Sequence, residues 1–71
     1  MQNPTLTLVT EDVEFPTVNI DVDGILIGSI RFEDNFDSLE INIDYPALKE
    51  YEIAIDYNQL IAAALILLEA A

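Results

Sequence analysis

The chain has 71 residues, of which 52% are hydrophobic, and its 14 Asp and Glu residues against two Lys and Arg give a net charge of −12. This length admits one domain, over residues 1–71, and the apolar content is that of a folding chain rather than a disordered one. No cysteine is present, which excludes disulfides and thiolate metal sites. Such acidity also argues against direct binding to nucleic acid or anionic lipid, since both select basic proteins.

Neither end of the sequence predicts a membrane or export segment. The first dozen residues have no basic region and no long apolar run, so we expect no secretory signal. The apolar run at residues 60–68 is shorter than the roughly 20 residues that span a bilayer. We therefore expect a cytoplasmic protein with no membrane partner.

The first third of the chain predicts short strands. Residues 5–9 alternate weakly between polar and apolar, as a strand does. The apolar alternation of residues 13–22 changes phase at Pro16, which has no N–H for a strand ladder. We expect an edge position or a bulge at that proline.

Asp23-Gly24 lies between two apolar runs and is a strong hairpin signal. It predicts a β-hairpin over residues 18–30. The strand after the turn, residues 25–32, is apolar at successive positions, which is typical of a strand covered on both faces. A two-residue turn would place Val22 opposite Ile25 and Ile20 opposite Ile27.

A second alternating pattern covers residues 39–45 and 51–57, with Pro46 between them and a polar loop at 33–38 before them. Apolar residues face each other if residues 46–50 form the loop, so we predict a second hairpin over residues 39–57. Alternatively, residues 47–57 begin a long helix with Pro46 in its first turn. That helix would have two apolar faces, whereas the alternation is unbroken, and the strand is favoured.

The predicted hairpin 39–57 carries carboxylates on its outer face. Asp44 would oppose Glu52, and Glu40 would oppose Asp56, although like charges directly opposite each other are destabilising. Alternate residues on a strand lie about 6.7 Å apart, and rows of carboxylates at such a spacing imitate a phosphate backbone. We interpret these four residues as a binding site for a basic protein surface, in an acidic protein-binding or inhibitory module. One form of this interpretation is that the module mimics nucleic acid. The alternative is a structural or assembly subunit whose charge serves solubility only.

The end of the chain, residues 58–71, predicts a helix with Asp56 as its N-cap. One face of this helix is expected to pack on the sheet, through Leu60, Ile61, Ala64, Leu67 and Leu68. The reverse face is also apolar, where a surface helix is normally polar, and we expect it to form a homodimer through Ala62, Ala63, Ile66 and Ala70. The predicted fold is α+β: an antiparallel sheet of four or five strands with one C-terminal helix packed on it.

No residue pattern predicts catalysis or a cofactor. Histidine and cysteine are absent, and Ser29 and Ser38 have no neighbouring base, so we expect no enzyme and no catalytic residues. Residues 19–24 resemble the opening of a calcium loop, but its closing glutamate would fall at Ile30, and we interpret the segment as a hairpin. The acidic loop at residues 33–37 could at most hold a hard cation weakly, and we predict no metal site.

Overall fold

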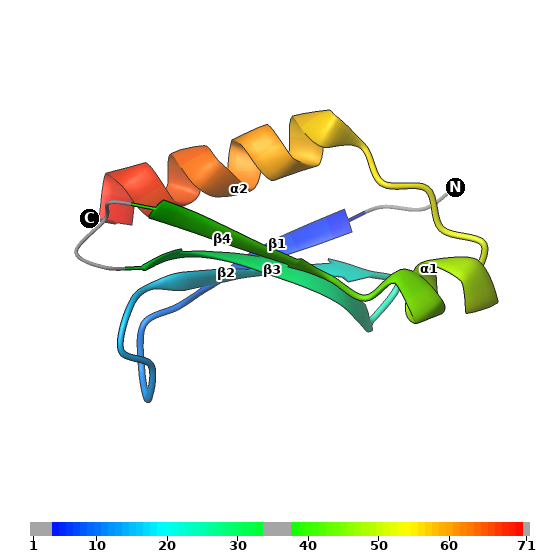
Figure 1. Cartoon of the computed structure of the whole chain (residues 1–71), viewed down its shortest axis with the longest axis horizontal. Helices are drawn as coiled ribbons and strands as arrows, with labels where there is room; N and C mark the ends of the chain where they lie inside the picture. The colour runs from blue at the N-terminus through cyan, green and yellow to red at the C-terminus, as the bar shows by residue number, and fades with distance from the viewer. Residues whose placement is uncertain (1–3, 34–37, 71) are drawn as a thin grey trace.

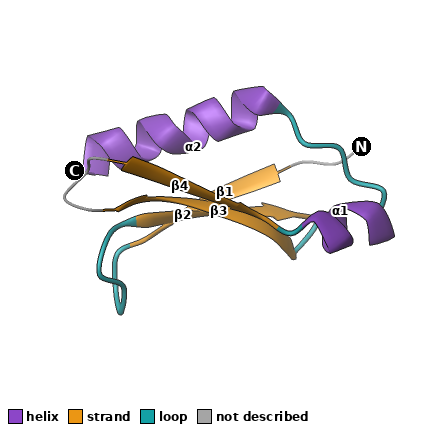
Figure 2. Ribbon diagram, in the orientation of Figure 1, coloured by secondary structure: helices purple, strands orange, loops and turns teal. Residues whose placement is uncertain are grey.

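The computed structural model describes residues 4–33 and 38–70. They form a four-stranded antiparallel sheet, in the order β1-β2-β3-β4, with one long helix packed on a single face (Figures 1 and 2). This confirms the predicted α+β architecture. The elements are β1 (Pro4–Val9), β2 (Thr17–Val22), β3 (Ile25–Glu33), β4 (Ser38–Ile43), α1 (Tyr45–Glu50) and α2 (Tyr57–Ala70).

The hairpin predicted around Asp23-Gly24 is confirmed, because β2 and β3 are joined by these two residues. Asp23 has φ 52° and Gly24 has φ 81°. Positive φ at both central residues gives the turn the twist that the flanking strands require. Val22 lies opposite Ile25, as predicted.

Further along this hairpin the predicted register is wrong by one residue. Ile20 lies opposite Gly28 rather than Ile27, because a bulge in β3 shifts the register. Ile27 and Ile30 have opposite parity in the sequence, so a regular strand would send one of them to each face. The extra residue lets both reach the core beneath α2, where each is at most 2% exposed. β3 is therefore covered by α2 on one face only, and not on both faces as predicted.

The predicted hairpin 39–57 is wrong. β4 pairs with β3 instead, with Ile41 opposite Ile30, and the polar loop that we expected between them falls mostly at residues 34–37, outside the described residues. Residues 51–57 form neither a strand nor the start of one long helix. The short α1 follows β4, the chain turns at residues 51–52, and α2 begins at Tyr57.

Residues 53–56, which alternate between apolar and other residues, do not join the sheet but connect α1 to α2. The backbone N–H of Ile53 donates to the carbonyl of Leu48 at 2.9 Å, which folds the segment back on α1. The Ile53 side chain is 8% exposed and belongs to the core. The alternation of apolar residues alone therefore could not distinguish a strand from this short connecting segment. In the segment Ile53 is buried and Ile55 is only partly buried.

The core is a single layer between the sheet and α2, and it holds Val18, Ile20, Val22, Ile27, Ile30, Ile53, Ala63 and Leu67. The other sheet face is polar, with Asn19 opposite Ser29 and Ser29 opposite Asn42. The β1–β2 connection extends away from α2 on that side (Figure 1). No helix among the described residues is long and apolar enough to cross a membrane.

Candidate interaction surfaces

The four carboxylates predicted to bind a basic partner do not share one face, because the hairpin that would have aligned them does not form. Glu40 lies on β4, on the polar face of the sheet, opposite Arg31. Asp44 precedes α1, Glu52 follows it, and Asp56 precedes α2. Asp44 therefore does not oppose Glu52 across a strand pair, nor does Glu40 oppose Asp56.

Two of these carboxylates have local structural roles at helix N-termini. The Oδ1 atom of Asp44 accepts the backbone N–H of Ala47 at 3.2 Å, which makes Asp44 the N-cap of α1. The Oδ1 atom of Asp56 accepts the N–H of Asn58 at 2.9 Å, as expected for the predicted N-cap of α2. Each satisfies a backbone donor that has no partner within its helix. Their positions are thus explained by folding alone.

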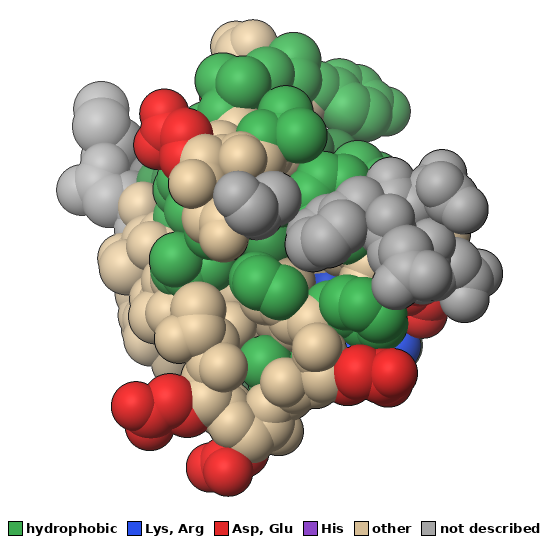
Figure 3. All heavy atoms as spheres, turned by 90° about the vertical axis from the view of Figure 1, so that its left-hand side faces the viewer, with side chains coloured by type: hydrophobic (Ala, Val, Ile, Leu, Met, Phe, Trp, Pro, Cys, Tyr) green, Lys and Arg blue, Asp and Glu red, His purple; other side chains and the backbone are tan. Residues whose placement is uncertain are grey.

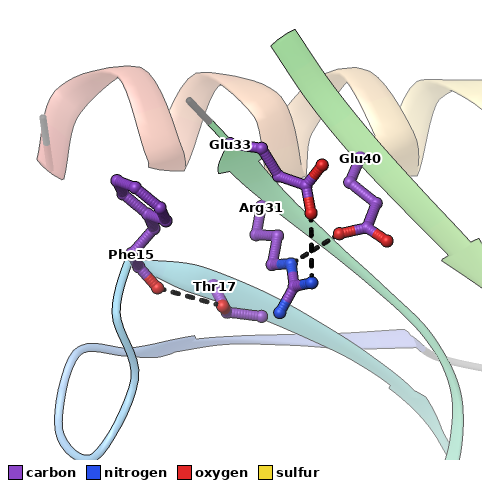
Figure 4. Close-up of polar contacts among 5 residues, drawn as sticks. All are labelled: Phe15, Thr17, Arg31, Glu33 and Glu40. Atoms are coloured by element: carbon purple, nitrogen blue, oxygen red, sulfur yellow. Dashed lines mark hydrogen bonds and ion pairs between the residues drawn. The ribbon is translucent and has the colours of Figure 1, made fainter. Parts of the chain in front are cut away.

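Glu40 belongs to a small ion-pair cluster on the polar face of the sheet (Figure 4). The Arg31 guanidinium donates to Glu40 at 2.6 Å and to Glu33 at 3.1 Å, and all three side chains are partly exposed. Hydrogen bonding with Glu40 raises the pKa of Glu33, and hydrogen bonds with Glu33 and Arg31 lower the pKa of Glu40. The bonds from Arg31 to both carboxylates also raise the pKa of Arg31. Arg31 thereby offsets one of the two negative charges beside β4.

The helix α2 is rotated relative to the expectation. Of the residues predicted for self-association, Ala63 is fully buried and Ile66 packs against the core, whereas Ala62 is half-buried and Ala70 is exposed. Ala63 faces the sheet because its small side chain lets the helix lie close. Ile61 and Leu68, which were predicted to pack on the sheet, are instead exposed. The exposed stripe consists of Tyr57 (78% exposed), Ile61 (58%), Leu65 (55%) and Leu68 (59%).

The sequence contains a signal for this stripe that the prediction missed. Positions i, i+4, i+8 and i+11 fall within about 80° of one another on a helix of 3.6 residues per turn. Tyr57, Ile61, Leu65 and Leu68 have this spacing. Because apolar residues cover most of the helix circumference, however, composition does not say which side faces the sheet.

A second exposed apolar region lies beside α2, over β4. The helix packs on β1, β2 and β3, so the α2-facing side chains of β4 are left partly uncovered: Leu39 is 41% and Ile41 is 48% exposed. A hollow of about 230 Å³ lies between β4 and the start of α2, and it is lined by Ile41, Ile43, Tyr45, Leu48, Ile55, Tyr57 and Leu60. We call Leu39 and Ile41 together with the α2 stripe the α2–β4 surface.

The carboxylates lie mainly at the two ends of the sheet. Glu11, Asp12 and Glu14 are all exposed in the β1–β2 connection, whereas Asp23 and Glu50 lie toward the opposite end, in the β2–β3 turn and in α1. Figure 3 shows hydrophobic side chains gathered toward α2, with most of the visible Asp and Glu side chains on the side away from it. Charge and apolar area are thus largely separated.

The described residues do not form a metal-binding site. In residues 4–33 and 38–70, no three His, Cys, Asp or Glu side chains come together as a metal-binding group would. Of the acidic loop considered as a weak cation site, Asp34 and Asp37 lie outside the described residues. No protein-family model, curated protein or solved structure matches the chain.

Proposed function

We propose that this protein is an assembly subunit that associates with copies of itself through the α2–β4 surface and performs no chemistry of its own. The observation that carries the proposal is the exposure of large apolar side chains on that surface, from 41% for Leu39 to 78% for Tyr57. Soluble monomers rarely expose contiguous apolar patches larger than a few hundred Å². Covering such a patch with a second copy removes apolar area from water, which favours association.

The acidity has a simple role in this proposal. A net charge of −12 on each copy opposes indiscriminate aggregation of a chain that is 52% hydrophobic. The exposed carboxylates Glu11, Asp12 and Glu14 at one end of the sheet, and Asp23 and Glu50 toward the other, lie away from the α2–β4 surface and support this role. A nucleic-acid mimic requires a continuous acidic face, and that hypothesis, like the cytoplasmic location, stays a prediction.

Sedimentation equilibrium over a range of protein and salt concentrations tests the proposal. We expect association that rises with protein concentration and strengthens with added salt, because salt screens the repulsion between acidic copies. Binding of a basic partner by the carboxylates would weaken with salt instead. A wild-type protein that stays monomeric at high micromolar concentration, in low and high salt alike, would contradict the proposal.

A matched pair of double variants locates the surface. Ile41→Glu with Leu65→Glu places two charges on the α2–β4 surface and should yield a monomer. Leu8→Glu with Leu26→Glu adds the same charge at two leucines outside that surface, which are 41% and 53% exposed, and should associate nearly as the wild type does. If both variants associate equally, the α2–β4 surface is not the contact.

A further inference from the structure

The outer edge of β4 lacks the lysine, proline and bulges that commonly keep edge strands from pairing. In residues 4–33 and 38–70, β4 ends the sheet and no strand lies beyond it. Lysine, proline and bulges commonly block edge strands in monomers. β4 has the sequence SLEINI and pairs with β3 without a register shift, so it has none of the three. The other edge strand, β1, begins with Pro4 and packs against α2.

The direction of the β4 backbone groups follows from its contacts with β3. The N–H of Asp44 donates to the carbonyl of Ile27 at 2.8 Å and therefore points toward β3. The carbonyl oxygen of Asn42 also points there, since it lies 2.8 Å from the position that a Cβ on Gly28 would take. Backbone groups alternate in direction along an antiparallel strand. The N–H and C=O groups of Leu39, Ile41 and Ile43 accordingly point outward, to the open edge.

We propose that two copies of this chain pair through β4 in antiparallel orientation, with Ile41 opposite the partner's Ile41. The inference rests on the proposed function, because it names the contact that the self-association uses. Leu39 would lie opposite the partner's Ile43, and each of these facing pairs exchanges two backbone hydrogen bonds. The two sheets become one continuous sheet of eight strands, with both α2 helices on the same face.

The side chains select this register over its neighbours. With Ile41 at the two-fold axis, Glu40 lies opposite the partner's Asn42, and no two carboxylates oppose each other. A shift of two residues in one direction places Glu40 opposite the partner's Glu40, and a shift in the other direction places it opposite the partner's Asp44. Like charges directly opposite are destabilising. A shift of one residue would set the apolar side of β4 against the polar side of its partner.

Charge and area near the edge are compatible with a second copy. Glu40 is the only charged residue of β4, and its carboxylate is held by Arg31 at 2.6 Å. A stable interface takes about 800 Å² from each partner, roughly a sixth of this chain's surface of 4936 Å². Pairing of the β4 strands alone would bury less surface than that. The hollow beside β4, with Tyr57 at its margin, supplies further apolar area on the same side.

Single-cysteine variants test the register directly, because the chain has no cysteine of its own. Facing residues of a hydrogen-bonded pair have Cα atoms about 5.5 Å apart, which a disulfide spans. Ile41→Cys should therefore form a covalent dimer under mild oxidation. Glu40→Cys should cross-link at least tenfold more slowly, since diagonal positions lie about 7–8 Å apart. Faster cross-linking of Glu40→Cys would overturn the proposed register.

A backbone test separates strand pairing from mere loss of apolar area. Ile41→Pro removes an outward N–H that the β3–β4 ladder does not use, so the fold should persist by circular dichroism. The dimer loses the two central hydrogen bonds, and its dissociation constant should rise about a hundredfold. Ile41→Thr, which keeps the N–H, should weaken association much less.

The outcomes distinguish this inference from the proposed function. A wild type that never associates overturns both. A wild type that associates, while Ile41→Pro associates equally well and Ile41→Cys does not cross-link, overturns only the β4 pairing. In that case the contact lies on the α2 stripe or elsewhere, and the assembly role stands. If Ile41→Pro fails to fold, the cross-linking rates of the two cysteine variants still decide the register.

Discussion

Truncating Leu67 tests the rotation of α2, on which the core and the exposed stripe both depend. Leu67 is fully buried, whereas its neighbour Leu68 is 59% exposed. Leu67→Ala removes apolar groups equivalent to about three methylenes, worth about 0.8 kcal/mol each on transfer. A cavity that collapses incompletely adds to that loss. We expect a loss of about 3 kcal/mol in the free energy of unfolding.

That loss is large for a chain of this size. A domain of 71 residues has an unfolding free energy of about 4–11 kcal/mol, from roughly 0.05–0.15 kcal/mol per residue. Urea denaturation followed by circular dichroism at 222 nm, a wavelength chosen for its sensitivity to helix, measures the change. Leu68→Ala is the matched control and should cost about 0.5 kcal/mol or less in dilute protein. Any further cost should appear only at concentrations where the protein associates.

Equal losses for the two alanine variants, or a larger loss for Leu68→Ala in dilute protein, would refute the assigned rotation. The larger loss for Leu68→Ala would mean that the exposed stripe is the core face. The assembly proposal would lose the observation that carries it, because the large apolar side chains of α2 would be buried within one copy.

Two further predictions concern polar groups. Asp44→Ala removes the N-cap of α1 and should lower the free energy of unfolding by about 1 kcal/mol, whereas Asp44→Asn keeps a capping oxygen and should cost much less in the same denaturation assay. Carboxyl-carbon NMR titration should place the pKa of Glu33 above and that of Glu40 below the ordinary glutamate value. The lowered pKa of Glu40 gives stability that is lost as pH falls through that pKa, whereas the raised pKa of Glu33 gives stability that is gained as pH falls through its own. Arg31→Met should raise the pKa of Glu40, and unchanged titration of Glu40 in that variant would contradict the assigned ion pair.

The sequence by itself determined the features that depend on neighbouring residues. Asp23-Gly24 fixed the β2–β3 turn, because few residue pairs tolerate positive φ at both positions. The alternation at residues 39–43 predicted β4, and Asp56 marked the start of the last helix. Each of these rests on local backbone preferences and side-chain period, which a short window of sequence contains.

The tertiary structure decided which elements meet and through which face. Residues 51–57 alternate as a strand does, yet β3 already provides the partner for β4, and Asp44 with Pro46 starts α1 at that point. Only the competition between possible pairings, which depends on the whole chain, resolves this choice.

The rotation of α2 and the bulge in β3 both follow from the packing of apolar side chains into one core between the helix and the sheet. A helix that is apolar around most of its circumference can bury several of its sides, and the shape of the sheet selects the one with Ala63 and Leu67. The bulge in β3, where the register with β2 shifts between Ile20 and Asp21, brings Ile27 and Ile30 to one core. The four carboxylates are separated because β4 pairs with β3 and residues 51–56 form no strand. The packing of the apolar residues therefore determines which of them remain exposed on the α2–β4 surface.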